Sequence, residues 1–263
     1  MPSVKTAAVI THGRDGVVAA LVRLRAVAAA CGVELFEDEA DGRAPDIAIV
    51  LGGDGTMLRA LARFLGSGVP VLGVNYGRVG FLTAVHADDL ESGLTRVFAG
   101  DYKTIELSTV DVSVGGEQRV AVNDVVVAGG TLGRMIELSY AIGGEDLGLQ
   151  PCDGLICATP TGSTAYNLSN GGPVLVWGID AMVLTFVAPH ALHIRPLVVP
   201  RGSDVTITNH TTSFDATVLV DGQPVGQLAA GEAASVRVGG QHSLLATLPE
   251  VTFFRRYGAT FGS

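Results

Sequence analysis

A glycine-rich stretch, Leu51-Gly52-Gly53-Asp54-Gly55-Thr56, has the composition of an anion-binding turn with a carboxylate at its centre. It follows the apolar run 47–50 and precedes a helix-like segment, 57–64, so the glycines are expected where a buried strand turns into a helix. Backbone N–H groups in such a turn, beside the positive end of a helix dipole, attract phosphate. A carboxylate repels phosphate, and this conflict is resolved if Asp54 handles a proton or a metal ion beside the phosphates. The alternative is a plain turn in which Asp54 or Thr56 caps the helix.

A second group of polar residues runs from Cys152 to Pro173 and is rich in threonine, serine, asparagine and glycine. Small hydroxyl side chains supply hydrogen-bond donors without bulk, which suits a ribose or phosphate ligand. Asp153 precedes a stretch, 154–179, that contains no charged residue. Its carboxylate is expected to accept hydrogen bonds from sugar hydroxyls or from an amide. A Thr/Ser-rich turn with capping roles is the alternative interpretation of the whole group.

Three further positions carry polar groups next to apolar runs. Asn123 and Asp124 begin the hydrophobic run 125–127, where they either bind adenine or ribose or form a turn. The sequence Val220-Asp221-Gly222-Gln223 is typical of a two-residue hairpin turn. Arg134 either neutralises phosphate or lies on the surface of a strand.

Composition limits the classes of partner. Of 263 residues, 48% are hydrophobic and 16% are charged, and the formal net charge is -9, so we expect a globular protein that binds neither nucleic acid nor an anionic membrane. Lysine occurs only at positions 5 and 103. Phosphate must therefore be held by arginine, by backbone amides or by a cation.

Several common sites are missing from the sequence. It contains neither a Gly-x-x-x-x-Gly-Lys-Ser/Thr phosphate loop nor a Gly-x-Gly-x-x-Gly dinucleotide motif, and its histidines and three cysteines have no zinc-like spacing. An odd number of cysteines and an N-terminus unlike a signal peptide favour the cytoplasm. The uncharged stretch 154–179 contains two prolines and many polar residues, so it is expected to line a pocket and not to cross a membrane.

The order of strand-like and helix-like segments changes near residue 100. Before it, strands near 4–10, 33–36, 47–50 and 69–75 alternate with helices near 17–30, 57–64 and 88–98, which predicts an α/β domain with a parallel sheet. After it, short strands separated by Gly-Gly turns predict an all-β, sandwich-like domain. We therefore expect an α/β domain over 1–99 and a β-rich dinucleotide-binding domain over 100–247, with the tail 248–263 packed back on the first.

Taken together, these motifs resemble the NAD kinases in order and spacing over nearly the whole chain. The resemblance rests on segments 52–56, 73–83, 123–124, 153–173, 189–192, 195–197, 220–223 and 253–255. The first segment is shared with lipid kinases and phosphofructokinases, whereas the segment from Asp153 to Pro173 is highly specific.

The resemblance implies transfer of the γ-phosphoryl group of ATP to the 2′-hydroxyl of the adenosine ribose of NAD, which gives NADP. It implies that Asp54 is the catalytic carboxylate, acting as base, as a ligand of Mg²⁺, or as both. With so little lysine, a divalent cation is expected. A homodimer or homotetramer is also implied. The residues implied to bind NAD are Asp54, Gly55, Arg59, Asn123, Asp124, Arg134, Asp153, Thr164, Ala165, Tyr166, Asn167, Leu168, Ser169 and Gln223, with Phe81 a further candidate for stacking on adenine.

Two departures from the family pattern and two rival functions accompany this interpretation. Family members often have glutamate where this chain has Asp124, and a basic or small residue where it has Pro151-Cys152. A lipid kinase would share the glycine–aspartate motif but requires a membrane-attracting surface, which this acidic chain does not suggest. A non-catalytic dinucleotide-binding regulator would have no need of Asp54.

Overall fold

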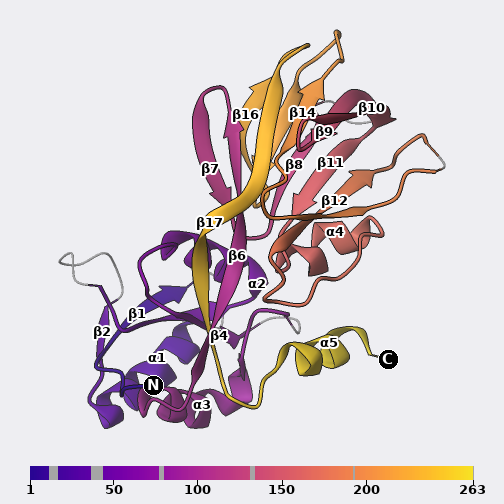
Figure 1. Cartoon of the computed structure of the whole chain (residues 1–263). Helices are drawn as coiled ribbons and strands as arrows, with labels where there is room; N and C mark the ends of the chain where they lie inside the picture. Colours follow the sequence, from indigo (N-terminus) through magenta and orange to yellow (C-terminus); the bar gives the residue numbers. More distant parts are fainter. Residues whose placement is uncertain (12–16, 37–43, 77–79, 131–133, 192, 263) are drawn as a thin grey trace. The chain divides into compact units, whose positions relative to one another are not determined.

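The computed structural model describes residues 1–11, 17–36, 44–76, 80–130, 134–191 and 193–262 (Figure 1). The chain divides into two compact units, Met1–Glu106 with Ser243–Ser263, and Leu107–His242. The boundaries fall within two long strands, β6 (Lys103–Val114) and β17 (Ala233–Thr247). Residues 77–79 of the 73–83 motif and Leu192 of the 189–192 motif lie outside the described residues.

The first unit is built on a parallel sheet. Its strands are β1 (Thr6–Thr11), β2 (Glu34–Phe36), β3 (Ile47–Gly52), β4 (Val71–Asn75) and β5 (Val85–His86), in the order β2-β1-β3-β4. The far edge of β4 pairs in parallel with β5 and, through Leu245, with the end of β17. Gly52 lies opposite Asn75 where β3 and β4 end, so the loops that follow these strands start side by side. The expected α/β architecture is confirmed.

Helices cover both faces of this sheet. Side chains of α1 (Val17–Cys31) and α3 (Leu90–Phe98, preceded by the 3-10 turn η2, Ala87–Asp89) form one core with Ile47, Ile49 and Leu51 of β3. The alternate residues Ala48 and Val50 are also fully buried, as expected when a second layer covers the other face. That layer includes α2 (Asp54–Arg63), which packs on β3 and β4.

Two helix boundaries differ from the sequence-based expectation. Helix α2 begins at Asp54, three residues before the predicted start at Met57, so that Asp54 lies in the first helical turn. The aromatic tail forms a helix, α5 (Phe253–Phe261), which the sequence pattern did not predict and whose N-cap is Thr252.

The second unit is an antiparallel β-sandwich, as expected. One sheet has the order β13-β12-β11-β8-β15-β16. The other contains β10, β9 and β14, then the first part of β17, with β6 and β7 alongside. Apolar side chains from both sheets form a common core. The remaining bounds are β7 (Glu117–Ala121), β8 (Asp124–Gly129), β9 (Ile136–Ile142), β10 (Glu145–Cys152), β11 (Gly154–Ala158), η3 (Gly162–Thr164), α4 (Tyr166–Ser169), β12 (Ala181–Val187), β13 (Leu197–Pro200), β14 (Val205–Asn209), β15 (Ala216–Val220) and β16 (Gln223–Leu228).

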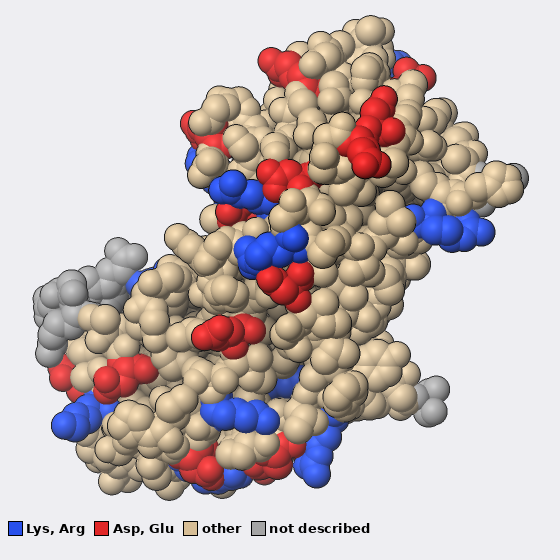
Figure 2. All heavy atoms as spheres, in the orientation of Figure 1, with Lys and Arg blue, Asp and Glu red and all other residues tan. Residues whose placement is uncertain are grey.

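The surface carries both signs of charge. On the face drawn in Figure 2, acidic and basic side chains are interspersed. Among the described residues, none of the helices combines the length and the apolar character that a membrane span requires. The uncharged stretch 154–179 instead forms β11, η3, α4 and the loop that follows.

Core packing in the first unit predicts different outcomes for two positions on α1. Leu24 is fully buried, whereas Val22 on the same helix is 59% exposed. We expect Leu24→Ala to lower the free energy of unfolding by about 2–5 kcal/mol, because it leaves a cavity. Val22→Ala, the matched control, is expected to change it by less than about 0.5 kcal/mol. Urea unfolding followed by circular dichroism measures both, and equal effects would contradict the packing described here.

Candidate functional site

The predicted site residues fall into two groups, one in each unit, and each group is described by itself. In the first unit, Asp54 is held at the start of α2. The N-cap of this helix is Gly53, with extended backbone and no side-chain capping bond, so neither Asp54 nor Thr56 serves as the cap. This excludes the capping interpretation of the glycine-rich turn. A carboxylate in the first turn is stabilised by the positive end of the helix dipole.

The carboxylate of Asp54 is fixed by backbone amides of the loop after β4. The N–H of Phe81 donates to Oδ2 at 2.6 Å, and the N–H of Leu82 donates to Oδ1 at 3.0 Å. A Cβ atom on Gly80 would lie 2.3 Å from Oδ1, so only glycine permits this approach. The two motifs that the sequence singled out, 52–56 and 73–83, therefore meet at this one side chain.

The surroundings of Asp54 leave space for a ligand. Asp54 is half-buried, and Gly55 and Arg59 are exposed. A Cβ atom on Gly53 or Gly55 would meet nothing within 4 Å. Open backbone at the N-terminus of a helix is suited to a phosphate group. Phe81 has a different role from stacking on adenine, because its ring is only 5% exposed and lies 5.3 Å from that of Phe253.

In the second unit, Asp221 organises the segment that carries Asn123 and Asp124. The Asp221-Gly222 pair forms the turn between β15 and β16, with φ of 48° and 78°, which confirms the predicted hairpin. The Asp221 carboxylate also accepts three hydrogen bonds, from the N–H groups of Val122, Asn123 and Asp124 at 2.9, 2.7 and 3.1 Å. Sequence reasoning assigned Asp221 to a turn alone and missed this role, because an Asp-Gly pair gives no sign of what its side chain binds.

The threonine-rich segment after β11 packs against the same backbone from another direction. Thr159 donates its N–H to the Asn123 carbonyl at 2.8 Å and its hydroxyl to the Val122 carbonyl at 2.7 Å. A Cβ atom on Gly162 would lie 2.0 Å from the Asn123 carbonyl oxygen. The 123–124 and 153–173 motifs, which are far apart in the sequence, are thus in direct contact.

Two buried polar atoms of these segments have no hydrogen-bond partner among the described residues. The Asn123 Oδ1 and Thr161 Oγ1 atoms are buried and form no hydrogen bond within the part of the chain that the structure describes. A buried polar atom with no partner costs about 1–3 kcal/mol. A ligand with complementary donors and acceptors would recover that energy, as an adenosine group can.

Residues 164–169 provide an exposed aromatic ring and a buried support. Tyr166 is 44% exposed, and Thr164, Ala165 and Leu168 are half-buried. The Asn167 amide is instead used within the fold, where Nδ2 donates to the carbonyls of Ser163 and Pro173 and Oδ1 accepts from Thr185. Of this predicted group, Asn167 therefore supports the loop, while Tyr166 and the exposed Ser169 are accessible.

Three predicted residues lie at different distances from the 122–124 segment. Gln223 is exposed and directly follows the Asp221-Gly222 turn, so it is close to that segment. Asp153 and Arg134 are exposed at the other end of β8 and β11, where Asp153 accepts the N–H of Gly129 through its carbonyl. The five residues of β11 separate Asp153 from the Asp124 end by about 16 Å.

The pKa values of two carboxyl groups in the second unit, Asp124 and Asp221, are raised. Asp124 is 6% exposed, and burial, with a further effect of the Asp221 charge, raises the pKa of its carboxyl group to about 7. Burial also raises the pKa of Asp221, against the effect of the three amide donors. Burial raises the pKa of the Cys157 thiol on β11, and the charge of Asp124 raises it further.

The described residues offer no complete metal cage. Among them, no group of three or more His, Cys, Asp or Glu side chains converges on one point. Mg²⁺ in phosphoryl-transfer sites is commonly held by one or two carboxylates together with substrate phosphates. Each Asp54 oxygen accepts one amide and retains a lone pair, so a single carboxylate remains able to contribute to such an ion.

The raised pKa of Asp124 predicts a pH-dependent stability. The native state retains this proton between about pH 4 and pH 7 whereas the unfolded chain loses it, so the free energy of unfolding falls as pH rises through that window. We expect Asp124→Asn to be more stable than the parent protein at pH 8, by on the order of a few kcal/mol, and to differ much less at pH 4. Urea unfolding at both pH values measures this difference. The exposed Asp153→Asn is the control, and a pH-independent difference for Asp124→Asn would contradict the prediction.

Comparisons with known proteins give one consistent family. The family model for the ATP-NAD kinase N-terminal domain matches residues 32–102, and that for the ATP-NAD kinase C-terminal domain matches residues 122–248. The NAD kinase of Heliobacterium modesticaldum is 44% identical over 215 residues, which cover 80% of this chain and 76% of that protein. The NAD kinase of Gemmatimonas aurantiaca is 41% identical over 217 residues, which cover 80% of this chain and 75% of that protein.

Solved structures have the same fold. Yeast NADH kinase, complexed with NADH, has a TM-score of 0.86 at 23% identity, with 100% of this chain and 89% of that chain covered. An NAD kinase from Archaeoglobus fulgidus, in complex with ATP, has a TM-score of 0.78 at 26% identity, with 98% and 97% covered. Both halves of the chain match NAD kinase domains, and the relatives align over most of their length. The chain therefore belongs to the NAD kinase family and is a kinase that phosphorylates NAD with ATP as donor.

Proposed function

We propose that Asp54 is the catalytic carboxylate of this NAD kinase. Its carboxylate takes the proton of the 2′-hydroxyl on the adenosine ribose of NAD while that oxygen attacks the γ-phosphorus of ATP. A bond from the 2′-oxygen to phosphorus forms, the bond from phosphorus to the β,γ-bridging oxygen breaks, and ADP leaves NADP behind. The observation that carries the proposal is the fixed orientation of Asp54 at an open helix N-terminus. A positioned base accelerates such a step by about 10²- to 10⁴-fold.

The remaining residues bind and orient the substrates. Asn123 and Asp124 hold the adenosine half of NAD, which is supported by the unpartnered Asn123 Oδ1. The exposed Tyr166 ring stacks on a flat ring of the ligand. Arg134 and Asp153 contact the dinucleotide further along, in keeping with their separation from Asp124. The other proposed contacts are Gly55 and Arg59 near phosphate, and Thr164, Ala165, Leu168, Ser169 and Gln223 around the dinucleotide, with Asn167 supporting the loop that carries them.

A divalent cation, most simply Mg²⁺ carried by ATP, completes the charge balance. It neutralises the phosphates in phosphoryl transfer, where positioning and charge neutralisation supply most of the acceleration. Asp54 is the residue that would hold it, as well as or instead of acting as the base. The scarcity of lysine supports this need.

The state of the protein in the cell is also part of the proposal. By family resemblance we propose a cytoplasmic homodimer or homotetramer. Light scattering coupled to size-exclusion chromatography would test the assembly, and a monomer at working concentrations would reject it.

The activity itself is tested by incubating the purified protein with NAD, ATP and Mg²⁺. We expect NADP to accumulate, detected with an NADP-specific dehydrogenase. Adding excess chelator should stop the reaction, and adding back Mg²⁺ should restore it, because the transferred phosphoryl group then regains its counter-charge. Activity that persists in chelator would reject the cation, and binding of NAD without product would favour a non-catalytic regulator.

Substitution of Asp54 tests the role of its carboxylate. Asp54→Asn should lower kcat by on the order of 10²-fold or more, because an amide cannot accept the ribose proton. Binding of NAD, measured by calorimetry, should remain within a few-fold of the parent value. Since one side of the asparagine would present N–H to an amide donor, the unfolding midpoint is measured in parallel. Full turnover in this variant would refute the base role.

A further inference from the structure

The C-terminal segment places a buried arginine next to the loop that orients Asp54. Arg256, on α5, is only 5% exposed. Its Nη1 atom donates to the carbonyl oxygens of Phe81 at 2.8 Å and Thr83 at 2.5 Å, and its Nη2 atom donates to Thr247 Oγ1 at 2.8 Å. These contacts lie within the first unit and hold both sides of the 81–83 segment.

One peptide group connects this arginine to the proposed catalytic carboxylate. The carbonyl of Phe81 accepts from Arg256, and the N–H of the same peptide group, that of Leu82, donates to Asp54 Oδ1. A hydrogen bond to the carbonyl side of a peptide polarises the peptide and strengthens the bond that its N–H donates. The positive guanidinium and the negative carboxylate are therefore linked through a single polarised amide.

Three of the hydrogen-bond acceptors of this buried cation are uncharged. A guanidinium removed from water is costly unless its charge is compensated, and the hydrogen-bond acceptors given above are two carbonyls and a hydroxyl. Burial lowers the pKa of Arg256 to about 10, while the Asp54 charge acts in the opposite direction. The Arg256 group remains charged at neutral pH. An apolar side chain such as methionine would pack at this position without this cost, so packing alone does not account for an arginine here.

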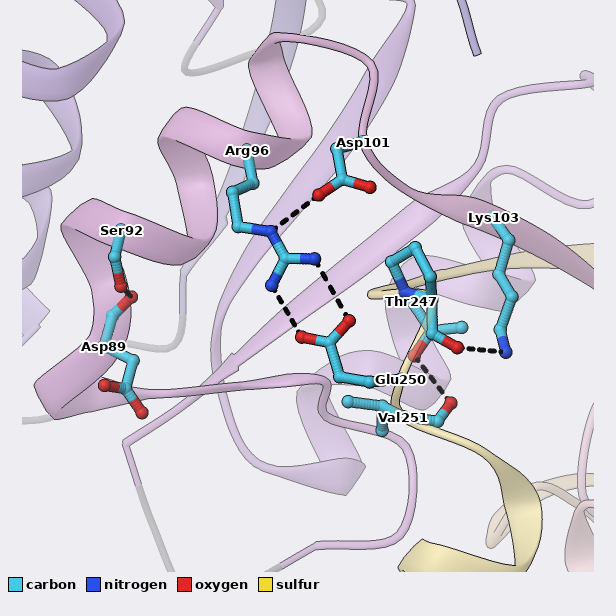
Figure 3. Close-up of polar contacts among 9 residues, drawn as sticks. Asp89, Ser92, Arg96, Asp101, Lys103, Thr247, Glu250 and Val251 are labelled. Atoms are coloured by element: carbon cyan, nitrogen blue, oxygen red, sulfur yellow. Dashed lines mark hydrogen bonds and ion pairs between the residues drawn. The ribbon is translucent and has the colours of Figure 1, made fainter.

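Further contacts anchor the segment between β17 and α5. Figure 3 shows Arg96 on α3 bound to both oxygens of Glu250 at 2.6 and 3.0 Å, and Lys103 bound to the carbonyl of Pro249 at 2.9 Å. On α5 itself, the Phe253 ring packs edge-on against Phe81. The start of the helix is therefore held on the body of the first unit, with Arg256 directed into the loop.

We propose that Arg256 is a positioning residue for the kinase reaction, which acts on Asp54 through the Phe81–Leu82 peptide group. One arm of the guanidinium, Nη1, binds both carbonyls, and the other arm, Nη2, is held by Thr247. The loop amides fixed in this way then fix the carboxylate. This inference rests on the proposed role of Asp54. It assigns a contribution to catalysis to the C-terminal helix, which contains none of the expected substrate contacts.

The test compares Arg256→Met with Arg255→Met, an exposed neighbour on the same helix. For Arg256→Met we expect kcat to fall by on the order of 10²-fold with little change in the KM for NAD, because a small displacement of a catalytic group is costly while substrate contacts are retained. Arg255→Met should retain the kcat of the parent protein. Equal kcat for the parent and Arg256→Met would overturn the proposal, and so would a rise in KM alone.

A measurement without turnover separates this proposal from the proposed function. Hydrogen exchange of the Phe81 and Leu82 amides in the ligand-free protein should become faster in Arg256→Met but not in Arg255→Met, since these amides are the ones bound to Asp54. If the Phe81 and Leu82 amides exchange at the same rate in Arg256→Met as in the parent protein, the positioning role of Arg256 is overturned, even if the protein converts NAD to NADP. Conversely, full activity of Asp54→Asn would refute the base role while leaving the exchange result intact.

Two further arms apply if Arg256→Met folds poorly. A cavity of about 190 Å³ adjoins Arg256 and is lined also by Gly80, Thr83 and Thr260, so a small cation can approach the space left in Arg256→Ala. Free guanidinium at a non-denaturing concentration should restore part of kcat to Arg256→Ala and none to Asp54→Asn. Arg256→Lys, which keeps the charge but loses the fork, should have a kcat between those of the parent protein and Arg256→Met. The role of the guanidinium fork would be overturned if free guanidinium failed to raise the kcat of Arg256→Ala and Arg256→Lys had the kcat of the parent protein.

Discussion

Two amide-to-carboxylate hydrogen bonds, from Phe81 and Leu82 to Asp54, are the constraint on which the first unit's candidate site depends. They require β3 and β4 to end side by side, so that the turn after one strand meets the loop after the other. They also require glycine at position 80, because a side chain there would occupy the space of the carboxylate. An acidic side chain at a helix N-terminus is favourable in itself. The loop after β4 also fixes the orientation of this carboxylate.

In the second unit, the carboxylate of Asp221 likewise holds a backbone segment in place. Asp221 accepts three consecutive backbone N–H groups and so fixes the start of β8, while the segment after β11 packs against the same backbone from its carbonyl side. Asp124 is buried beside this arrangement, and burial raises its pKa, with a further contribution from the charge of Asp221. In each unit, a carboxylate bound to backbone amides holds a segment that carries predicted substrate contacts.

Because the chain belongs to the NAD kinase family, these local arrangements can be considered in terms of one reaction, the transfer of a phosphoryl group to NAD. An enzyme that phosphorylates a ribose hydroxyl must orient a weak nucleophile and a highly charged donor, and most of its acceleration comes from positioning and charge neutralisation. Because the chain contains only two lysines, it has few lysine side chains with which to neutralise the substrate phosphates. In the arrangement proposed above, helix N-termini, backbone amides and arginine take this role, and the buried Arg256 adds a residue behind the loop.

The sequence by itself determined the fold class and the motifs. Alternating strand and helix patterns gave the parallel α/β unit, closely spaced glycine turns gave the sandwich, and the 52–56, 123–124 and 153–173 motifs were recognised from residue types and spacing alone. Tertiary structure decided how these residues are used. The Asp221 side chain, the use of Asn167 within the fold, the burial of Phe81 and the approach of Arg256 all depend on contacts between segments distant in sequence, such as 81–83 and 256. Local patterns specify period and turn type, but the partner of a side chain is fixed only when the chain has packed, because hydrogen bonds of this kind join whichever groups the fold brings within about 3 Å.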